Sequence, residues 1–205
     1  MISLENLLVE IRACHACTDL PLGPRPVVVA DARAPILIVG QAPGAKVHAS
    51  GVPWSDASGR RLRQWLGVDE ATFYDPAQFA IVPMGFCYPG RGKSGDLPPR
   101  PECRSLWHPQ LLPLLINVKL ILAIGQYAQA YCLGDTRKAD LTATVLAWRD
   151  YAPRTFPLPH PSPRNQLWLK RNPWFETGVI PALQTRVADL LTTKCLAGSN
   201  ISCQK

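Results

Sequence analysis

The stretch Pro35-Ile36-Leu37-Ile38-Val39-Gly40 decides the fold of this chain, because it is a continuous apolar run that ends at a glycine. Such a run is typical of a strand that is buried on both faces of a parallel sheet. Further runs of this kind follow at 79–82, at 119–125 and, more weakly, at 156–158. The sequence therefore predicts a central, mostly parallel, four-stranded sheet.

Helical patterns separate these strands. Helices are expected at residues 4–13, 58–66, 102–116, 126–133 and 173–191, and two prolines, Pro109 and Pro113, should kink or shorten the third. Strands that alternate with helices indicate an α/β fold, here a three-layer α/β/α sandwich. The chain has no internal repeat and no linker, so residues 1–205 should form a single domain with a flexible tail over about 192–205.

The composition indicates a folded, basic protein. The 205 residues are 47% hydrophobic, which allows a sizeable core, and they carry a formal net charge of +7. DNA is a natural partner for such a charge, although a merely basic enzyme would carry it too. No run of about 18 apolar residues and no secretory signal is present, so we expect a cytoplasmic monomer without membrane contact.

Four of the seven cysteines have a spacing that fits one metal centre. Cys14 and Cys17 form a close pair, while Cys87 and Cys103 flank a stretch rich in proline and glycine. Thiolates are soft ligands, which favours an iron–sulfur cluster or zinc. The spacing alone leaves buried thiols or two disulfides as alternatives. A reducing cytoplasm and an odd cysteine count argue against the disulfides.

Ligands bind at the carboxyl ends of parallel strands, so the segments that follow the strands are the candidates for a binding site. Gly40-Gln41-Ala42-Pro43-Gly44 follows the first strand, and its glycines allow a ligand to approach the backbone. Farther along, Trp54 offers a flat face for stacking a ring and Asp56 supplies a carboxylate. The alternatives are a plain turn and a tryptophan of the core.

A second motif, His160-Pro161-Ser162-Pro163-Arg164-Asn165, follows the fourth strand. His160 could donate to a developing anion, and Ser162 could bind a phosphate. Basic and bulky apolar residues are interleaved around this motif: Arg164, Leu167, Trp168, Lys170 and Arg171. The mixture suits insertion into DNA, where a wedge fills the space of an extruded base. A solvated basic loop is the alternative.

The order of these motifs, from Cys14 to Trp174, resembles the uracil-DNA glycosylase superfamily, and the cysteines resemble its iron–sulfur branch, family 4. The resemblance implies that Cys14, Cys17, Cys87 and Cys103 bind a 4Fe–4S cluster with a structural role. The run 160–165 is also similar to that of the single-strand-selective monofunctional uracil glycosylase.

The chain departs from the iron–sulfur branch at three positions. Gln41 stands where that branch has a glutamate, Pro83 where an asparagine reads the base, and Trp54 where a phenylalanine stacks it. Asp56 nearly matches an aspartate of the related family 5. The resemblance therefore implies that either Asp56 or Gln41 places the attacking water, while the main chain at Gln41 and Ala42 reads the base edge.

Together these features predict a monofunctional DNA glycosylase that flips out uracil, or a related deaminated base, and leaves an abasic site. Leu167 or Trp168 would fill the gap in the base stack, and the basic residues of the loop would hold phosphates. No lyase step is expected, because the nearest lysine, Lys46, is expected to face solvent. The alternatives are an iron–sulfur DNA-binding protein without glycosylase activity and a zinc-stabilised or electron-transfer protein.

Overall fold

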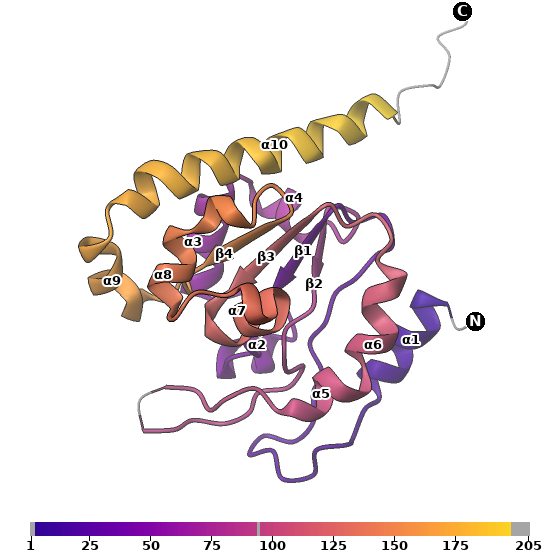
Figure 1. Cartoon of the computed structure of the whole chain (residues 1–205). Coiled ribbons are helices and arrows are strands. Elements are labelled where there is room, and N and C mark those ends of the chain that lie inside the picture. The colour runs from indigo at the N-terminus through magenta and orange to yellow at the C-terminus, as the bar shows by residue number, and fades with distance from the viewer. Residues whose placement is uncertain (1–2, 94, 198–205) are drawn as a thin grey trace, which may run out of the picture.

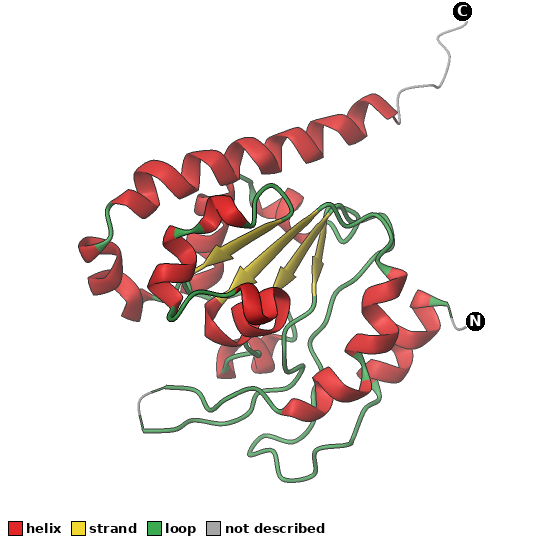
Figure 2. Cartoon of the chain, viewed as in Figure 1, coloured by secondary structure: helices red, strands yellow, loops and turns green. Residues whose placement is uncertain are grey.

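The computed structural model describes residues 3–93 and 95–197, with side chains up to residue 192. Its centre is a four-stranded sheet in the order β2-β1-β3-β4, drawn as arrows in Figures 1 and 2. The strands are β1 (Ile36–Val39), β2 (Phe79–Ile81), β3 (Leu120–Ile124) and β4 (Thr155–Leu158). The expected four strands are confirmed, and all of them, rather than most, are parallel.

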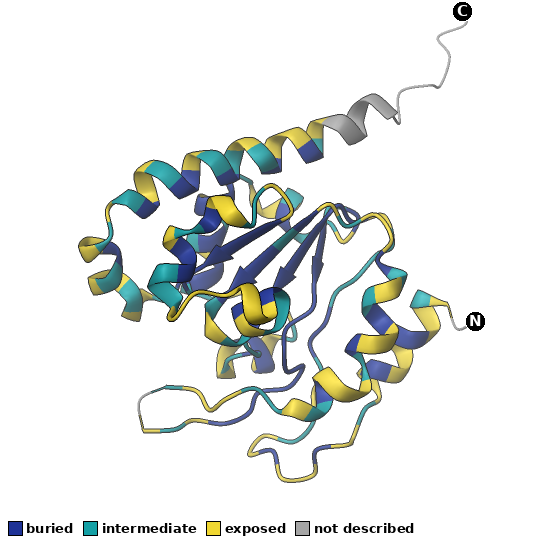
Figure 3. Cartoon of the chain, viewed as in Figure 1, coloured by how far each residue is buried: buried dark blue, intermediate teal, exposed yellow. Residues whose placement is uncertain are grey.

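The strands lie in the interior of the molecule, as Figure 3 shows. Every strand residue is buried except Ile121, which is half-buried. Successive residues of β1 point to opposite faces of the sheet: Ile36 and Ile38 pack in one core cluster, and Leu37 and Val39 in another. Because both faces are covered, the strands have the unbroken apolar runs seen in the sequence.

Two layers of helices cover the sheet, which confirms the three-layer α/β/α arrangement. One core cluster includes residues of α3 (Ala57–Leu66), α4 (Glu70–Tyr74), α8 (Leu141–Leu146), α9 (Gln166–Arg171) and α10 (Ile180–Ala197). The opposite cluster includes residues of α1 (Leu4–Arg12), α5 (Pro101–Leu106), α6 (His108–Leu111) and α7 (Gly125–Leu133).

Several helices differ from the sequence prediction. The helix expected at 102–116 is interrupted at Trp107, and Pro109 and Pro113 begin the short turns that follow. Four short helices were not predicted: α4, α8, α9 and α2 (Ala45–Ser50). Helices of five or six residues carry too little periodicity to be recognised, and their packing on the sheet stabilises them. The last predicted helix begins with a π-helical turn at Phe175–Val179.

The structure also differs from the prediction at the C-terminal tail. The helix α10 continues to Ala197, so residues 192–197 are not part of a tail, while 198–205, with Cys203, lie outside the described residues. The segment 19–33 pairs at Val29 with Ile81 and so covers the free edge of β2. None of the described helices is long and apolar enough to cross a membrane.

Candidate active site

The strand order places a cavity at the carboxyl ends of the strands. The chain leaves β1 towards β2 on one side and later returns to add β3 on the other, so the connections diverge and open a crevice there. The cavity measures about 540 Å³, which is within the usual range for small-molecule sites. Seven of the residues predicted from the sequence line it: Gln41, Ala42, Trp54, Asp56, His160, Ser162 and Arg164.

Trp54 forms one wall of this cavity. Its backbone has a φ of 56°, which is rare for a residue with a side chain. The indole lies against Gly40, where an added Cβ would come within 3.1 Å of Cζ2. Its ring faces that of His160, with 5.5 Å between the centroids and 33° between the planes. Trp54 is therefore half-buried and available to a ligand rather than enclosed in the core.

The position of Trp54 depends on Gly59 in the first turn of α3. A Cβ at Gly59 would lie 1.7 Å from the Trp54 carbonyl oxygen. We expect Gly59→Ala to lower the free energy of unfolding by about 1–3 kcal/mol, the usual cost of overpacking. Denaturant unfolding checks this, with Gly178→Ala as the control because nothing lies within 4 Å of its added carbon. Equal stability of the two variants would contradict the prediction.

His160 is held as a neutral hydrogen-bond donor. The backbone N–H of Ser162 donates to Nδ1 at 3.2 Å, so the ring proton resides on Nε2. Burial lowers the pKa of His160, and this outweighs the opposing effect of Asp56 and Asp96. Asn165 fixes the loop by donating from Nδ2 to the His160 carbonyl oxygen at 2.8 Å. The histidine therefore offers an Nε2–H group at neutral pH.

Two residues are candidates for placing a water, Gln41 and Asp56. In each of them, one side-chain atom already makes a hydrogen bond within the protein. Gln41 donates from Nε2 to the Leu97 carbonyl oxygen at 2.9 Å, so its Oε1 remains as an acceptor. Asp56 is the N-cap of α3, where Oδ1 accepts from the Gly59 N–H at 3.0 Å. The structure brings both to the cavity, and the choice between them stays a prediction.

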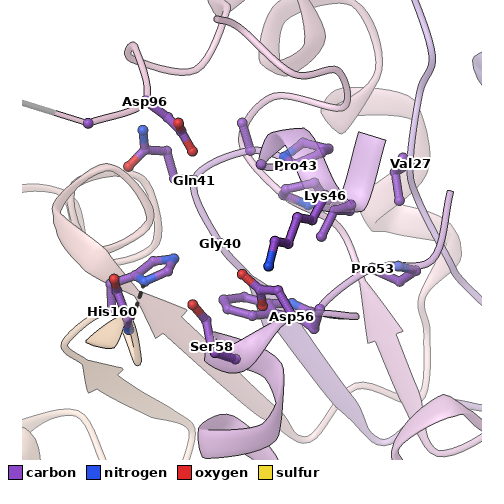
Figure 4. A pocket seen from close by; sticks show the side chains of 18 of the residues that line it. Val27, Gly40, Gln41, Pro43, Lys46, Pro53, Asp56, Ser58, Asp96 and His160 are labelled. Atoms are coloured by element: carbon purple, nitrogen blue, oxygen red, sulfur yellow. Dashed lines mark hydrogen bonds between the residues drawn. The ribbon is translucent and has the colours of Figure 1, made fainter. Parts of the chain in front are cut away.

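Four further polar residues line the cavity and were not among the predicted site residues: Lys46, Ser58, Asp96 and Asn165. Figure 4 shows Lys46 directed towards Asp56 and the Ser58 hydroxyl pointing inward. Lys46 is exposed, as expected, but the unpredicted helix α2 also places it in the lining of the cavity. Ser58 follows directly after the segment of Trp54 and Asp56, which was the one signal that could have pointed to it.

Pro83 also lines the cavity, but its side chain can neither donate nor accept a hydrogen bond. Its carbonyl oxygen lies 3.0 Å from Nε2 of the buried His108, which donates to it. Desolvation lowers the pKa of His108, so this ring is neutral. A base edge at this wall would therefore meet apolar surface, and polar recognition must come from other parts of the cavity.

The two candidate wedge residues both lie in helix α9 but have different surroundings. Leu167 is 57% exposed. Trp168, by contrast, donates from Nε1 to Thr142 Oγ1 at 2.9 Å and packs against Trp174 and Phe175. The exposed cations Lys170 and Arg171 end the helix. Only Leu167 of the two apolar residues is thus free to enter another molecule.

The four predicted metal ligands are free thiols. Cys17, Cys87 and Cys103 are buried and Cys14 is half-buried. Burial raises the pKa of Cys103 to about 12; the Phe86 N–H opposes this rise, and the other three cysteines add to it slightly. The Phe86 N–H donates to its Sγ at 3.3 Å. Thiolate sulfur is the usual ligand of iron–sulfur clusters, so the donor type of these four residues fits such a cluster.

Among the residues that it describes, the structure does not indicate a site for a single metal ion. Within the described ranges 3–93 and 95–197, no group of three or more His, Cys, Asp or Glu side chains is placed to hold a metal ion. The 4Fe–4S cluster therefore stays a prediction. Cys132 lies in α7, packs against the core cluster that also contains Cys103, and is not one of the four.

The fold and the cavity define an α/β protein with a ligand site at the strand ends, closed by a histidine-bearing loop. A family model for the uracil DNA glycosylase superfamily matches residues 27–184, which is more than half of the chain. The chain therefore belongs to the uracil DNA glycosylase superfamily. The match includes the whole sheet and every lining residue of the cavity, and Cys14 and Cys17 precede it.

Proposed function

We propose that this protein is a monofunctional DNA glycosylase that hydrolyses the N-glycosidic bond of uracil or a related deaminated base. The observation that carries the proposal is the placement of Trp54 opposite a neutral His160 in one cavity, in a chain of this superfamily. A flat aromatic ring can hold a flipped base, and a fixed donor can stabilise the charge that forms when the base leaves.

Trp54 and His160 have complementary parts in this mechanism. The base stacks on the exposed face of the indole, and its carbonyl oxygen receives a hydrogen bond from Nε2–H of His160. As the glycosidic bond breaks, the base leaves with the electron pair, and the negative charge develops on that oxygen. One such donor in a water-poor site is worth about 2.7–4 kcal/mol of transition-state stabilisation. The polar groups of Gln41 and Asp56, which line the same cavity, would orient the attacking water.

The exposed residues around the cavity would bind DNA. Arg164 lies at the rim, and Lys170 and Arg171 extend the positive surface along α9, so these cations can contact phosphates. Leu167 is our candidate for the wedge, because Trp168 is anchored to Thr142. Flipping a nucleotide costs a few kcal/mol and is easiest at a mismatch or in a single strand. A deaminated cytosine opposite guanine would therefore be a favourable target.

We further propose that Cys14, Cys17, Cys87 and Cys103 hold a 4Fe–4S cluster. Bound there, the cluster would supply a structural cross-link and no step of the hydrolysis. The ligands come from the segment after α1, the segment after β2 and helix α5. These segments continue into walls of the cavity at Pro83 and Asp96. The cross-link would therefore fix the walls of the active site.

Cleavage assays test the proposal directly. We expect protein with a full cluster content to convert uracil-containing oligonucleotides, single- or double-stranded, into abasic products that alkali cleaves. Hypoxanthine and xanthine substrates would show whether the apolar wall at Pro83 widens the range of bases. Borohydride trapping would detect any Schiff base with Lys46, and we expect none. DNA binding without excision of any of these bases would favour the non-catalytic alternative.

A further inference from the structure

The loop between Cys87 and Cys103 is docked on the turn that follows β1. Within the loop, Gly92 N–H donates to the Gly95 carbonyl oxygen at 2.7 Å, and Leu97 N–H to that of Gly90 at 2.9 Å. From the turn, Gln41 donates to the Leu97 carbonyl oxygen at 2.9 Å. These bonds give the loop a defined hairpin shape and hold it against the cavity.

This docking places the carboxylate of Asp96 in the cavity. Figure 4 shows Asp96 next to Gln41, on the side of the cavity away from Asp56. Its Oδ2 lies 3.5 Å from the position that a Cβ on Gly44 would take. The charge of Asp96 also reaches His160, whose pKa it raises slightly against the larger effect of burial. Asp96 is therefore close to the group that would bind the leaving base.

The two carboxylates of the cavity differ in what they already bind. Asp56 Oδ1 accepts the Gly59 N–H that caps α3. The carboxylate of Asp96, among the residues that the structure describes, takes part in no hydrogen bond or ion pair. Gln41, its neighbour, has an amide that can orient a water but cannot take a proton from it. Both carboxylate oxygens of Asp96 are thus available to a water, whereas one oxygen of Asp56 is already bound.

We propose that Asp96 is the catalytic base that accepts a proton from the attacking water, while the neighbouring Gln41 orients that water. This inference rests on the proposed glycosylase function. The water oxygen bonds to the sugar C1′ as the glycosidic bond breaks, and the base leaves with the electron pair. The proton of the water passes to Asp96 and then to the base anion or to solvent. No further reactant is needed.

The test compares single-turnover excision of uracil by Asp96→Asn, Asp56→Asn and the exposed Asp135→Asn control. We expect Asp96→Asn to lower the rate roughly 10²–10⁴-fold, the usual contribution of a general base, with DNA affinity unchanged. Asp56→Asn should cost less, and Asp135→Asn nothing. The affinity is measured by fluorescence anisotropy, and the visible absorbance of the cluster reports its integrity.

Moving the carboxylate to position 41 tests whether a loss of rate comes from the missing base or from a disturbed structure. Because Gln41 lies beside Asp96, the double variant Gln41→Glu/Asp96→Asn should recover at least about tenfold of the lost rate, a fraction of a general-base contribution. An Asp96→Asn rate within about threefold of the parent, or a double variant without recovery, would overturn the inference. A parent protein that excises no base would instead contradict the proposed function itself.

Discussion

Replacing His160 with alanine should lower the single-turnover rate of base excision by roughly 10²–10³, the usual loss for one donor to a developing anion. The expected loss of rate follows from the hydrogen bonding of the His160 ring. The Ser162 N–H occupies Nδ1, so Nε2–H is the only donor that the neutral ring can offer. The measurement is single-turnover excision of uracil from an oligonucleotide, with the DNA affinity determined in parallel and expected to change little.

The pH dependence of the parent protein provides a second check on His160. Burial lowers the pKa of this ring below its ordinary value of 6.5, so the neutral form persists below pH 6.5. Protonation of Nδ1 would break the hydrogen bond from Ser162. We therefore expect the histidine-dependent loss of rate to begin below the ordinary histidine range and to be missing from His160→Ala. A parent rate that already falls as the pH drops through 6.5 would contradict this assignment.

Replacing Cys103 with serine should abolish the visible absorbance of the cluster and lower the free energy of unfolding by more than about 3 kcal/mol, because metal-binding energy is also folding energy. Cys103 is the strongest choice among the four, since it is buried and its thiol receives a hydrogen bond from Phe86. Iron content, absorbance and denaturant unfolding of the purified protein are the measurements.

Cys132→Ser is the matched control for this experiment. Its thiol is also desolvated, and burial raises its pKa to about 12, but it lies in α7 and is not one of the four predicted ligands, although it packs against the same core cluster as Cys103. We expect this variant to keep its iron and to lose only about 1 kcal/mol, the usual effect of a single substitution. If Cys103→Ser kept its iron and was as stable as Cys132→Ser, the four-cysteine cluster would be the wrong model.

The sequence alone determined the sheet and the two principal residues of the cavity. A strand buried on both faces is apolar throughout, so the run 35–40 indicated β1 and its parallel neighbours. Because parallel strands end at one edge, the segments that follow them were expected to form the binding site, and the structure brings Trp54 and His160 together there. These inferences needed only local patterns and one rule of topology.

The tertiary structure decided what else enters the cavity. Lys46 reaches it through the short helix α2, and Asp96 through a hairpin docked on Gln41, and neither element has a local pattern strong enough to predict. Likewise, only packing shows that Trp168 is anchored while Leu167 is exposed. Strands are specified by their own side chains, whereas the position of a loop depends on contacts with residues far away in the chain.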